Sequence, residues 1–446
     1  MTDKITQIIK RQGNLVAYDR DRIVTAIFRA LVSTGCNDRQ LAERLGLEVE
    51  RTLLTVHGAG STPSIEEIQD IVEKVLLESG HEDTARAYME YRRQRAQARA
   101  TRAYSFEVTD NIPYKKIYEV LCWNMAHGCD SIPAMNELIE RGEMPRLIKD
   151  SNRRYVAEIG QAAQMILERR DEVRLVIIAG PSSSGKTTTT MKLDEHLRRA
   201  GLALHTINVD NYFFDREQNP RDEFGDYDYE SPHALDLSLI NSHLEQLLAG
   251  RTVRAPHYDF KTGRRQLNVH EVTLRSNEVL LLDSLHGLYD AMTVSIPSAH
   301  KFRLYIETLG QFRAADGQFM RWADHRLLRR MIRDSWHRNS TPEATITHWR
   351  YVRRSELQYI IPFIGTADFL VNSALPYELP FLKHLLFHYF APAIEKYRAD
   401  PVRQDAYIRA KRIYEFLAPL VAVADDAIVP PDSLLREFIG GSCYVY

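Results

Sequence analysis

The stretch from Arg174 to Lys192 reads RLVIIAGPSSSGKTTTTMK, and it decides the fold that the sequence predicts. Its short apolar run at 175–179 is rich in β-branched residues, which is typical of a buried strand in a parallel sheet. The run ends at Gly180, and a helical pattern begins at Lys186. Between them lies the GxxxxGK[ST] spacing of a phosphate-binding loop, in the strand-loop-helix context that this motif requires. A glycine-rich turn that matches by accident would rarely have both flanking elements, so we expect the chain to bind a nucleoside triphosphate.

The chemistry of such a loop assigns roles to its residues. Backbone N–H groups turn inward around the phosphates, and the helix N-terminus adds partial positive charge. Lys186 is expected to reach the β- and γ-phosphates, and the Thr187 hydroxyl to ligate Mg²⁺. The predicted contacts of the bound nucleotide are Gly180, Ser182, Ser183, Ser184, Gly185, Lys186, Thr187 and Thr188.

The composition narrows the class of protein. A chain of 446 residues with 44% hydrophobic content allows about two to three domains with real cores. The net charge of −2 predicts no general attraction to nucleic acid or to a membrane surface. The four cysteines are widely spaced without a CxxC pair, so we expect neither a disulfide framework nor a zinc site. No apolar run approaches the length of about 18 residues that a membrane helix needs, and we expect a cytoplasmic protein with reduced thiols.

The N-terminal part has its own pattern. Residues 5–20 predict a small hairpin, and the apolar residues that follow Asp19 have helical spacing as far as Gly35. Ser64 and Glu67 form a capping box before another helix, and a last helix is predicted over 81–99. The basic cluster at 92–102 has no interleaved aromatic residues, so we interpret it as a solvated helix end rather than a nucleic-acid site.

This pattern resembles the ATP-cone, a small regulatory nucleotide-binding module, over about residues 5–95. The likeness is carried by IKRxG at 9–13, by YD at 18–19 with RI at 22–23, and by AYxxYR at 87–92. The resemblance implies that ATP or dATP phosphates contact Lys10, Arg11 and Arg22. The simpler alternative is a basic turn on a small helical domain.

Two acidic residues follow further predicted strands. Residues 203–209 lead into Asp210, and the apolar run 279–282 ends in Asp283. The carboxyl ends of parallel strands meet where open α/β sheets bind their ligands, so Asp210 can accept a proton from an attacking hydroxyl and Asp283 can serve Mg²⁺. Residues 302–306 and 367–371 predict two more strands. The arginine-laden stretch 321–354 predicts either groups that neutralise phosphate charge under a lid or a solvated helix face.

Residues 172–446 resemble the uridine kinase and phosphoribulokinase group of P-loop kinases. The matching blocks, in order, are GPSSSGKTT at 180–188, VDNYFFDRE at 209–217, YDYESPHALD at 227–236, YDFKTGRR at 258–265, LLLDSLHGL at 280–288, LLRRMIRDSWHRN at 327–339 and ADFLVNSALPYEL at 367–379. The resemblance implies that Asp210 deprotonates a 5′-hydroxyl and that Asp228 holds ribose hydroxyls. It places Tyr258 and Arg265 at the nucleoside, and the arginines Arg330, Arg333 and Arg338 at the phosphates.

Two departures from that group bear on specificity. Asp283 stands where uridine kinases commonly have glutamate, and Gly263 stands where uridine–cytidine kinases carry a histidine that reads the base. The second departure removes a hydrogen bond to a pyrimidine without an obvious replacement in the sequence.

The sequence therefore predicts an α/β P-loop kinase with a mostly parallel sheet flanked by helices, preceded by a mostly helical ATP-cone with a hairpin. The predicted domains are 1–100 for the ATP-cone, 101–170 for a helical connector and 171–446 for the kinase. We expect ATP and Mg²⁺ as cofactors, a nucleoside as acceptor, uridine-like in particular, nucleotide regulation at the ATP-cone, and a homo-oligomer without nucleic-acid or membrane partners. Two alternatives stay open: a phosphoribulokinase-like kinase of another sugar or polyol, and a nucleotide sensor without turnover.

Overall fold

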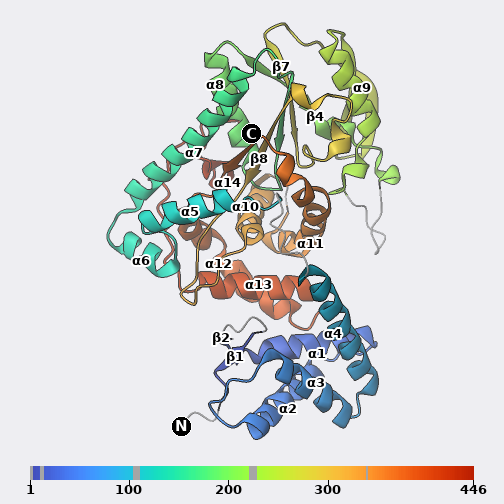
Figure 1. Cartoon of the computed structure of the whole chain (residues 1–446), viewed down its shortest axis with the longest axis vertical. Helices are drawn as coiled ribbons and strands as arrows, with labels where there is room; N and C mark the ends of the chain where they lie inside the picture. Colours follow the sequence, from blue (N-terminus) through green and yellow to red (C-terminus); the bar gives the residue numbers. More distant parts are fainter. Residues whose placement is uncertain (1–3, 11–14, 104–110, 220–228, 338–339, 446) are drawn as a thin grey trace. The chain divides into compact units, whose positions relative to one another are not determined.

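The computed structural model describes residues 4–10, 15–103, 111–219, 229–337 and 340–445. The chain forms two compact units, which Figure 1 colours along the sequence. The first comprises Met1–Val108 with Pro392–Ile408, and the second comprises Thr109–Ala391 with Arg409–Tyr446. Each unit is described by itself.

The first unit has the predicted hairpin and helices. Strands β1 (Gln7–Ile9) and β2 (Leu15–Ala17) pair antiparallel, and the helices are α1 (Arg20–Ser33), α2 (Arg39–His57), α3 (Ile65–Glu78) and α4 (Glu82–Ala103). The Asp19 side chain accepts a hydrogen bond from the backbone of Asp21 and so begins α1. The capping box before α3 is present, with the Ser64 and Glu67 side chains each accepting from the other's backbone N–H. Helices α1 and α3 therefore begin at the capping residues that the sequence indicates.

A five-stranded sheet organises the second unit. Its strands are β3 (Leu175–Ala179), β4 (Ala203–Asn208), β7 (Glu278–Ser284), β8 (Lys301–Glu307) and β9 (Phe369–Asn372). They lie in the order β4-β7-β3-β8-β9, and every neighbouring pair is parallel. All five residues of β3 are buried, as a central strand covered on both faces requires. This confirms the predicted mostly parallel sheet flanked by helices.

Helices surround this sheet. In Figure 1, α7 and α8 lie to one side of the strands and α9 to the other. The helices of this unit are α5 (Tyr114–Ala126), α6 (Ile132–Glu140), α7 (Met144–Glu168), α8 (Lys186–Arg199), α9 (Leu237–Leu248), α10 (Trp322–His337), α11 (Pro342–Tyr359) and α14 (Arg436–Ile439). Helices α12 (Glu378–Tyr397) and α13 (Gln404–Leu417) each contain residues of both units. Strands β5 (Val253–Asp259) and β6 (Arg264–Val272) form a separate antiparallel pair.

The register of the parallel strands brings three segments together. Asp283 of β7 is paired with Ile178 of β3 on one side and with Asn208 of β4 on the other. The loop that follows β3, the turn that follows β4 and the last residues of β7 therefore lie beside one another, at the carboxyl edge where such sheets bind ligands.

The segment before the sheet packs into the second unit. Glu158 of α7 accepts a hydrogen bond from the backbone N–H of Asn372 in β9, at 2.8 Å, and pairs with Lys116 of α5 at 2.9 Å. The Tyr155 and Thr189 hydroxyls, from α7 and α8, are 2.6 Å apart. Helix α7 is thus bonded to the edge strand β9 and to the helix α8 that follows the phosphate-binding loop.

In the described part of the chain, no helix combines the length and the apolar character that crossing a membrane would require. The four cysteines, Cys36, Cys122, Cys129 and Cys443, are all free thiols.

Candidate active site

The phosphate-binding loop connects β3 to α8 in a tight turn. A Cβ on Gly180 would lie 2.4 Å from the carbonyl oxygen of Ile306 in β8, so a side chain there would collide with backbone. Ser183 has φ +59° and Gly185 has φ +86°, which is left-handed backbone. The Lys186 ammonium donates to the Gly180 carbonyl at 3.0 Å. The Lys186 side chain therefore lies back across the loop and contacts Gly180, the first residue of the motif.

The loop retains donors for an anion. Within the described part of the chain, the Ser183 and Ser184 hydroxyls are buried and have no hydrogen-bond partner. Buried hydroxyls of this kind are costly unless a ligand uses them. Together with the N-terminus of the 14-residue helix α8, they fit the phosphates of a nucleotide.

The two predicted carboxylates lie at the same edge. The Thr190 hydroxyl donates to Asp283 at 3.3 Å. Burial raises the pKa of Asp283, while the charge of Lys186 opposes this and the charge of Asp210 adds to it. Burial also lowers the pKa of Lys186, against the charge of Asp283. Asp210 is exposed in a short 3-10 turn after β4, where its backbone N–H donates to the Asn208 side chain at 3.1 Å. Lys186, Asp283 and Asp210 are thus brought within electrostatic reach of one another.

The oxygen ligands of this edge fit Mg²⁺. Thr187 is exposed in the first turn of α8, and the Asp283 carboxylate is nearby through Thr190. Mg²⁺ prefers hard oxygen ligands and usually takes only one or two carboxylates beside substrate phosphates. A hydroxyl and one carboxylate are therefore a suitable protein contribution.

Four arginines of α10 point at the loop. Arg326 donates to the Ser182 carbonyl at 3.2 Å and Arg329 to the Ser183 carbonyl at 3.3 Å. Arg330 donates to the Ser182 hydroxyl at 2.9 Å and Arg333 to the same oxygen at 3.4 Å. Spacing at i, i+3, i+4 and i+7 places these guanidinium groups on one face of the helix. That face is turned to the loop and not to solvent, since Arg326, Arg329 and Arg330 are buried.

Carboxylates neutralise these buried arginines. Arg326 pairs with Glu307 at 2.9 Å and donates to Glu356 at 2.9 Å, and Arg329 donates to Glu378 at 2.7 Å. Arg330 pairs with Asp334 at 3.0 Å and with Glu230 at 3.3 Å. Burial by itself would raise the pKa of Glu378, but the charges of Arg329 and His325 lower it to about 2. Burial by itself would also raise the pKa of Glu230. A hydrogen bond from His348 and the charge of Arg330 lower that pKa to about 2.

The acceptor-side residues lie near Asp210. Tyr258 of β5 is buried, and its backbone N–H donates to the Asn211 side chain at 3.2 Å. Its ring lies 5.6 Å from that of Phe213 and 4.9 Å from that of Phe260. Arg265 is engaged with protein groups: it pairs with Asp236 at 2.9 Å, and its guanidinium lies 5.1 Å from the Phe214 ring centre. Asp228 and Arg338 lie outside the described residues.

Arg216 occupies the space beside Gly263. A Cβ on Gly263, which has φ +71°, would lie 2.6 Å from the Arg216 Nε and 3.0 Å from its Cβ and Cζ. The Arg216 backbone N–H donates to the Gly263 carbonyl at 2.9 Å. In the part of the chain that the structure describes, the Arg216 guanidinium has no ion-pair partner. Arg216 belongs to the VDNYFFDRE block at 209–217, but no role could be predicted for it, because no spacing links it to position 263.

The basic residues predicted for the regulatory nucleotide are spread over the first unit. Lys10 follows β1 and is half-buried. Arg22 is exposed in α1, 3.6 Å from Asp19, and Arg11 lies outside the described residues. A cavity of about 780 Å³ in this unit is lined by other side chains, among them Lys4, Tyr18, Arg20 and Arg44. The contacts of a regulatory nucleotide stay a prediction.

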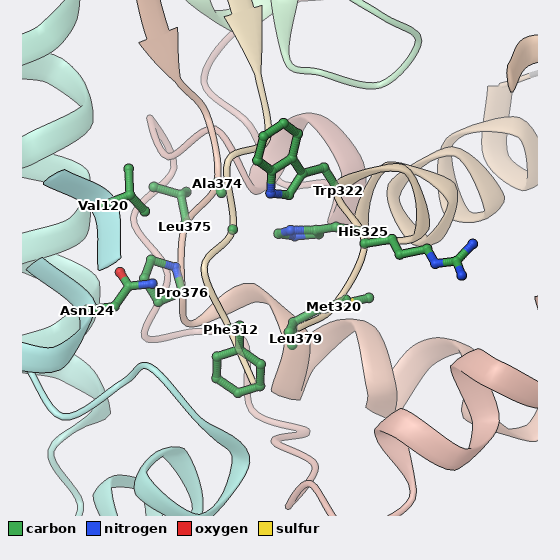
Figure 2. Close-up of a pocket in the computed structure, with 12 residues that line it drawn as sticks. Val120, Asn124, Phe312, Met320, Trp322, His325, Ala374, Leu375, Pro376 and Leu379 are labelled. Carbon is green, nitrogen blue, oxygen red and sulfur yellow. The ribbon is translucent and has the colours of Figure 1, made fainter. Parts of the chain in front are cut away.

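A small pocket is lined by residues of α5 and of the first turns of α10 (Figure 2). His325 reaches into it from α10, while Val120 and Asn124 face it from α5. The His325 Nε2 is 3.1 Å from the Glu378 carboxylate, and burial lowers the pKa of the imidazole. With a volume of about 20 Å³, the pocket has room for about one water molecule and none for a nucleoside.

Comparison with known proteins agrees with this geometry. Residues 6–97 match the ATP cone domain, and residues 175–377 match the phosphoribulokinase / uridine kinase family. The uridine kinase of Deinococcus deserti is 32% identical over 195 residues, which are 44% of this chain and 84% of that protein. The uridine kinase of Brevibacillus brevis is 27% identical over 198 residues, 44% of this chain and 83% of that protein.

Two solved structures are also similar, each with a TM-score of 0.33 and 17% identity over 48% of this chain. They are a putative fructose transport system kinase from Silicibacter sp. TM1040, covered to 97%, and a possible uridine kinase from Bacillus stearothermophilus, covered to 98%. With an ATP cone domain at residues 6–97, the chain belongs to the phosphoribulokinase / uridine kinase family and is a kinase.

Proposed function

We propose that this kinase transfers the γ-phosphoryl group of ATP to the 5′-hydroxyl of a nucleoside, with a uridine-like nucleoside as the expected acceptor. The observation that carries the proposal is the meeting of Lys186, Asp283 and Asp210 at one edge of the sheet. The parallel register of β3, β7 and β4 places them there. A site that only bound a nucleotide would need no exposed carboxylate on the acceptor side.

On the nucleotide side, the loop residues would bind and orient the phosphates. The N-terminal N–H groups of α8, the Ser183 and Ser184 hydroxyls and Lys186 supply donors and positive charge. Thr187 and Asp283 would hold Mg²⁺, which when bound neutralises charge on the β- and γ-phosphates. Catalysis of this kind is mostly positioning and electrostatic stabilisation.

The arginines of α10 would divide between two tasks. Arg330 is buried and held by Asp334 and Glu230, so we assign it to positioning the loop through the Ser182 hydroxyl. Arg333 is partly exposed, lies 3.4 Å from the same hydroxyl, and its charge lowers the pKa of Lys186. We therefore assign the neutralisation of the transferred phosphoryl group to Arg333 in preference to Arg330.

On the acceptor side, Asp210 would orient the hydroxyl and accept its proton. The hydrogen bond between Tyr258 and Asn211 fixes β5 beside the turn that carries Asp210. The aromatic rings of Phe213, Tyr258 and Phe260 offer an apolar surface on which a nucleobase could stack.

The test is ADP release from ATP·Mg²⁺ with a panel of nucleosides, pentoses and sugar phosphates. Rapid turnover with a nucleoside is expected, and Asp210→Asn should remove it with ATP affinity nearly unchanged. The control is Asp316→Asn, an exposed carboxylate in the loop after β8, which should leave the rate unchanged. Turnover only with a sugar phosphate or polyol would replace the nucleoside by that acceptor. ATP binding without turnover on the whole panel would overturn the proposal in favour of a nucleotide sensor.

A further inference from the structure

The C-terminal segment lies against the phosphate-binding loop. The Glu437 carboxylate of α14 accepts a hydrogen bond from the Thr188 backbone N–H at 3.1 Å and another from the Thr188 hydroxyl at 2.6 Å. Both donors meet the same carboxylate oxygen, Oε2. Thr188 and Glu437 are both buried, so this contact is made inside the protein and not across solvent.

Thr188 lies among the backbone donors that are expected to bind the phosphates. Thr188 lies in the first turn of α8, where backbone N–H groups have no partner within the helix. These are the donors that a phosphate-binding loop offers to its anion. A carboxylate oxygen that receives an N–H and an O–H there stands in for a phosphate oxygen, and the same two donors cannot serve both at once.

The charge of Glu437 adds to this competition. Burial lowers the pKa of Lys186 and raises the pKa of Asp283; the Glu437 charge opposes the first shift and adds to the second, so it acts on the groups that would meet the phosphates and Mg²⁺. Two anions at one desolvated site repel each other strongly. Phosphates can take their place only after the carboxylate has moved away from Thr188.

Other contacts hold the segment in place. A Cβ on Gly185 would lie 2.5 Å from Leu434 Cδ1, so Leu434 packs directly on the loop glycine. Asp432 pairs with Lys192 of α8 at 3.1 Å. The Phe438 ring lies 4.9 Å from the guanidinium carbon of Arg329 in α10. The segment is thus fixed to both helices that shape the loop.

We propose that residues 432–440 act as a self-inhibitory plug of the nucleotide site, with the Glu437 carboxylate occupying the Thr188 donors until ATP displaces it. The inference rests on the proposed ATP site and is independent of the acceptor. The plug would make the apparent ATP affinity lower than that of the open loop, because ATP must first displace the carboxylate.

The first test measures ATP binding calorimetrically on the full-length Glu437→Gln variant, without any acceptor. Glutamine keeps an oxygen that can accept both hydrogen bonds but removes the charge. Because hydrogen bonds to charged groups are stronger than neutral ones, we expect the Kd for ATP to fall about tenfold. The control is Asp425→Asn, which removes the same charge from an exposed residue that precedes the 432–440 segment and should leave the Kd unchanged. An unchanged or higher Kd in Glu437→Gln would overturn the proposal.

The second test needs no variant. Hydrogen exchange of the wild-type chain is compared with and without ATP, and with adenosine as the control that lacks phosphates. We expect ATP to slow exchange in the loop and to speed it in residues 432–440, with adenosine doing neither. Slower exchange in both segments would show that the C-terminal segment closes on the nucleotide, and the plug would be wrong. Neither readout depends on turnover. Failure to find the acceptor can therefore be distinguished from failure of the plug proposal.

Discussion

At the scale of single residues, Arg216 is the basic side chain that lies against Gly263. The resemblance to the uridine kinase group implies that Gly263 stands where uridine–cytidine kinases carry a base-reading histidine, and Arg216 fills the space beside that glycine. A guanidinium only donates hydrogen bonds, so it favours an acceptor that presents carbonyl or anionic oxygens. We expect Arg216 to replace the missing histidine as the group that recognises the acceptor.

Replacing Arg216 by alanine should therefore weaken acceptor binding and leave the nucleotide side intact. We expect the acceptor KM to rise about tenfold or more, as the loss of a charge-assisted hydrogen bond predicts, with the KM for ATP unchanged. The control is Arg254→Ala, an exposed arginine of β5 that pairs with Glu271. The measurement is steady-state kinetics with the acceptor found in the panel. Equal acceptor KM values for Arg216→Ala and Arg254→Ala would contradict the role assigned to Arg216.

Residues that belong to a local pattern could be predicted, and residues that act across distant segments could not. Lys186, Thr187, Asp210 and Asp283 each follow a predicted strand, so the topology of a parallel sheet was enough to bring them together. The contact of Glu437 with Thr188 joins positions 249 residues apart in the chain. No periodicity or spacing marks such a pair, because only the packing of the C-terminal segment on the loop creates it.

At the level of elements, α10 supports the phosphate-binding loop through hydrogen bonds from buried arginines, and carboxylates of other elements pair with these arginines. The arginine-laden stretch suggested either lid arginines or a solvated face, and the solvated face is wrong for Arg326, Arg329 and Arg330. Helical spacing shows that the arginines share a face but not what covers that face. The carboxylates that cover it, Glu307 at the end of β8 and Glu378 at the start of α12, come from other elements.

Removing one of these arginines should destabilise the fold in a pH-dependent way. Arg329→Met leaves the Glu378 carboxylate buried without its guanidinium, which costs about 3–5 kcal/mol at neutral pH. Because the pKa of Glu378 is lowered from 4.5 to about 2 in the folded chain, the stability from its ionised form is present above about pH 4.5 and is lost as the pH falls towards 2.

Urea unfolding at about pH 7 and about pH 4 measures this effect. Without the Arg329 guanidinium, burial raises the pKa of Glu378, so the carboxyl of the variant is protonated at the lower pH and the variant's deficit should shrink. Arg198→Met is the matched control, because Arg198 pairs with Asp194 at the surface and such pairs contribute about 1 kcal/mol or less. A deficit of the same size at both pH values would show that Arg329 acts through packing alone.

The whole molecule joins an ATP cone domain to a kinase. The sequence predicted both modules, because each carries its own caps, strands and motif blocks. For residues 101–170 it predicted only a helical connector, because the contacts of α7 with β9 and α8 are made by single polar side chains that belong to no motif. The segregation of phosphate chemistry into the second unit leaves the ATP cone domain free for regulation, and we propose that it binds ATP or dATP for this purpose.

The proposed regulation can be separated from catalysis because the two groups of basic residues belong to different units. In the wild-type chain, dATP titrated at fixed ATP and acceptor should change the rate or the oligomer size, measured by coupled assay and light scattering. In Lys10→Ala/Arg11→Ala, which removes two cations expected to contact phosphate, both responses should vanish while the rate without dATP stays the same. Arg51→Ala, an exposed arginine of α2 that pairs with Glu48, should respond as the wild type does. A response that survives the double substitution would place the regulatory nucleotide elsewhere. A lower rate without dATP would instead tie Lys10 and Arg11 to the kinase reaction itself.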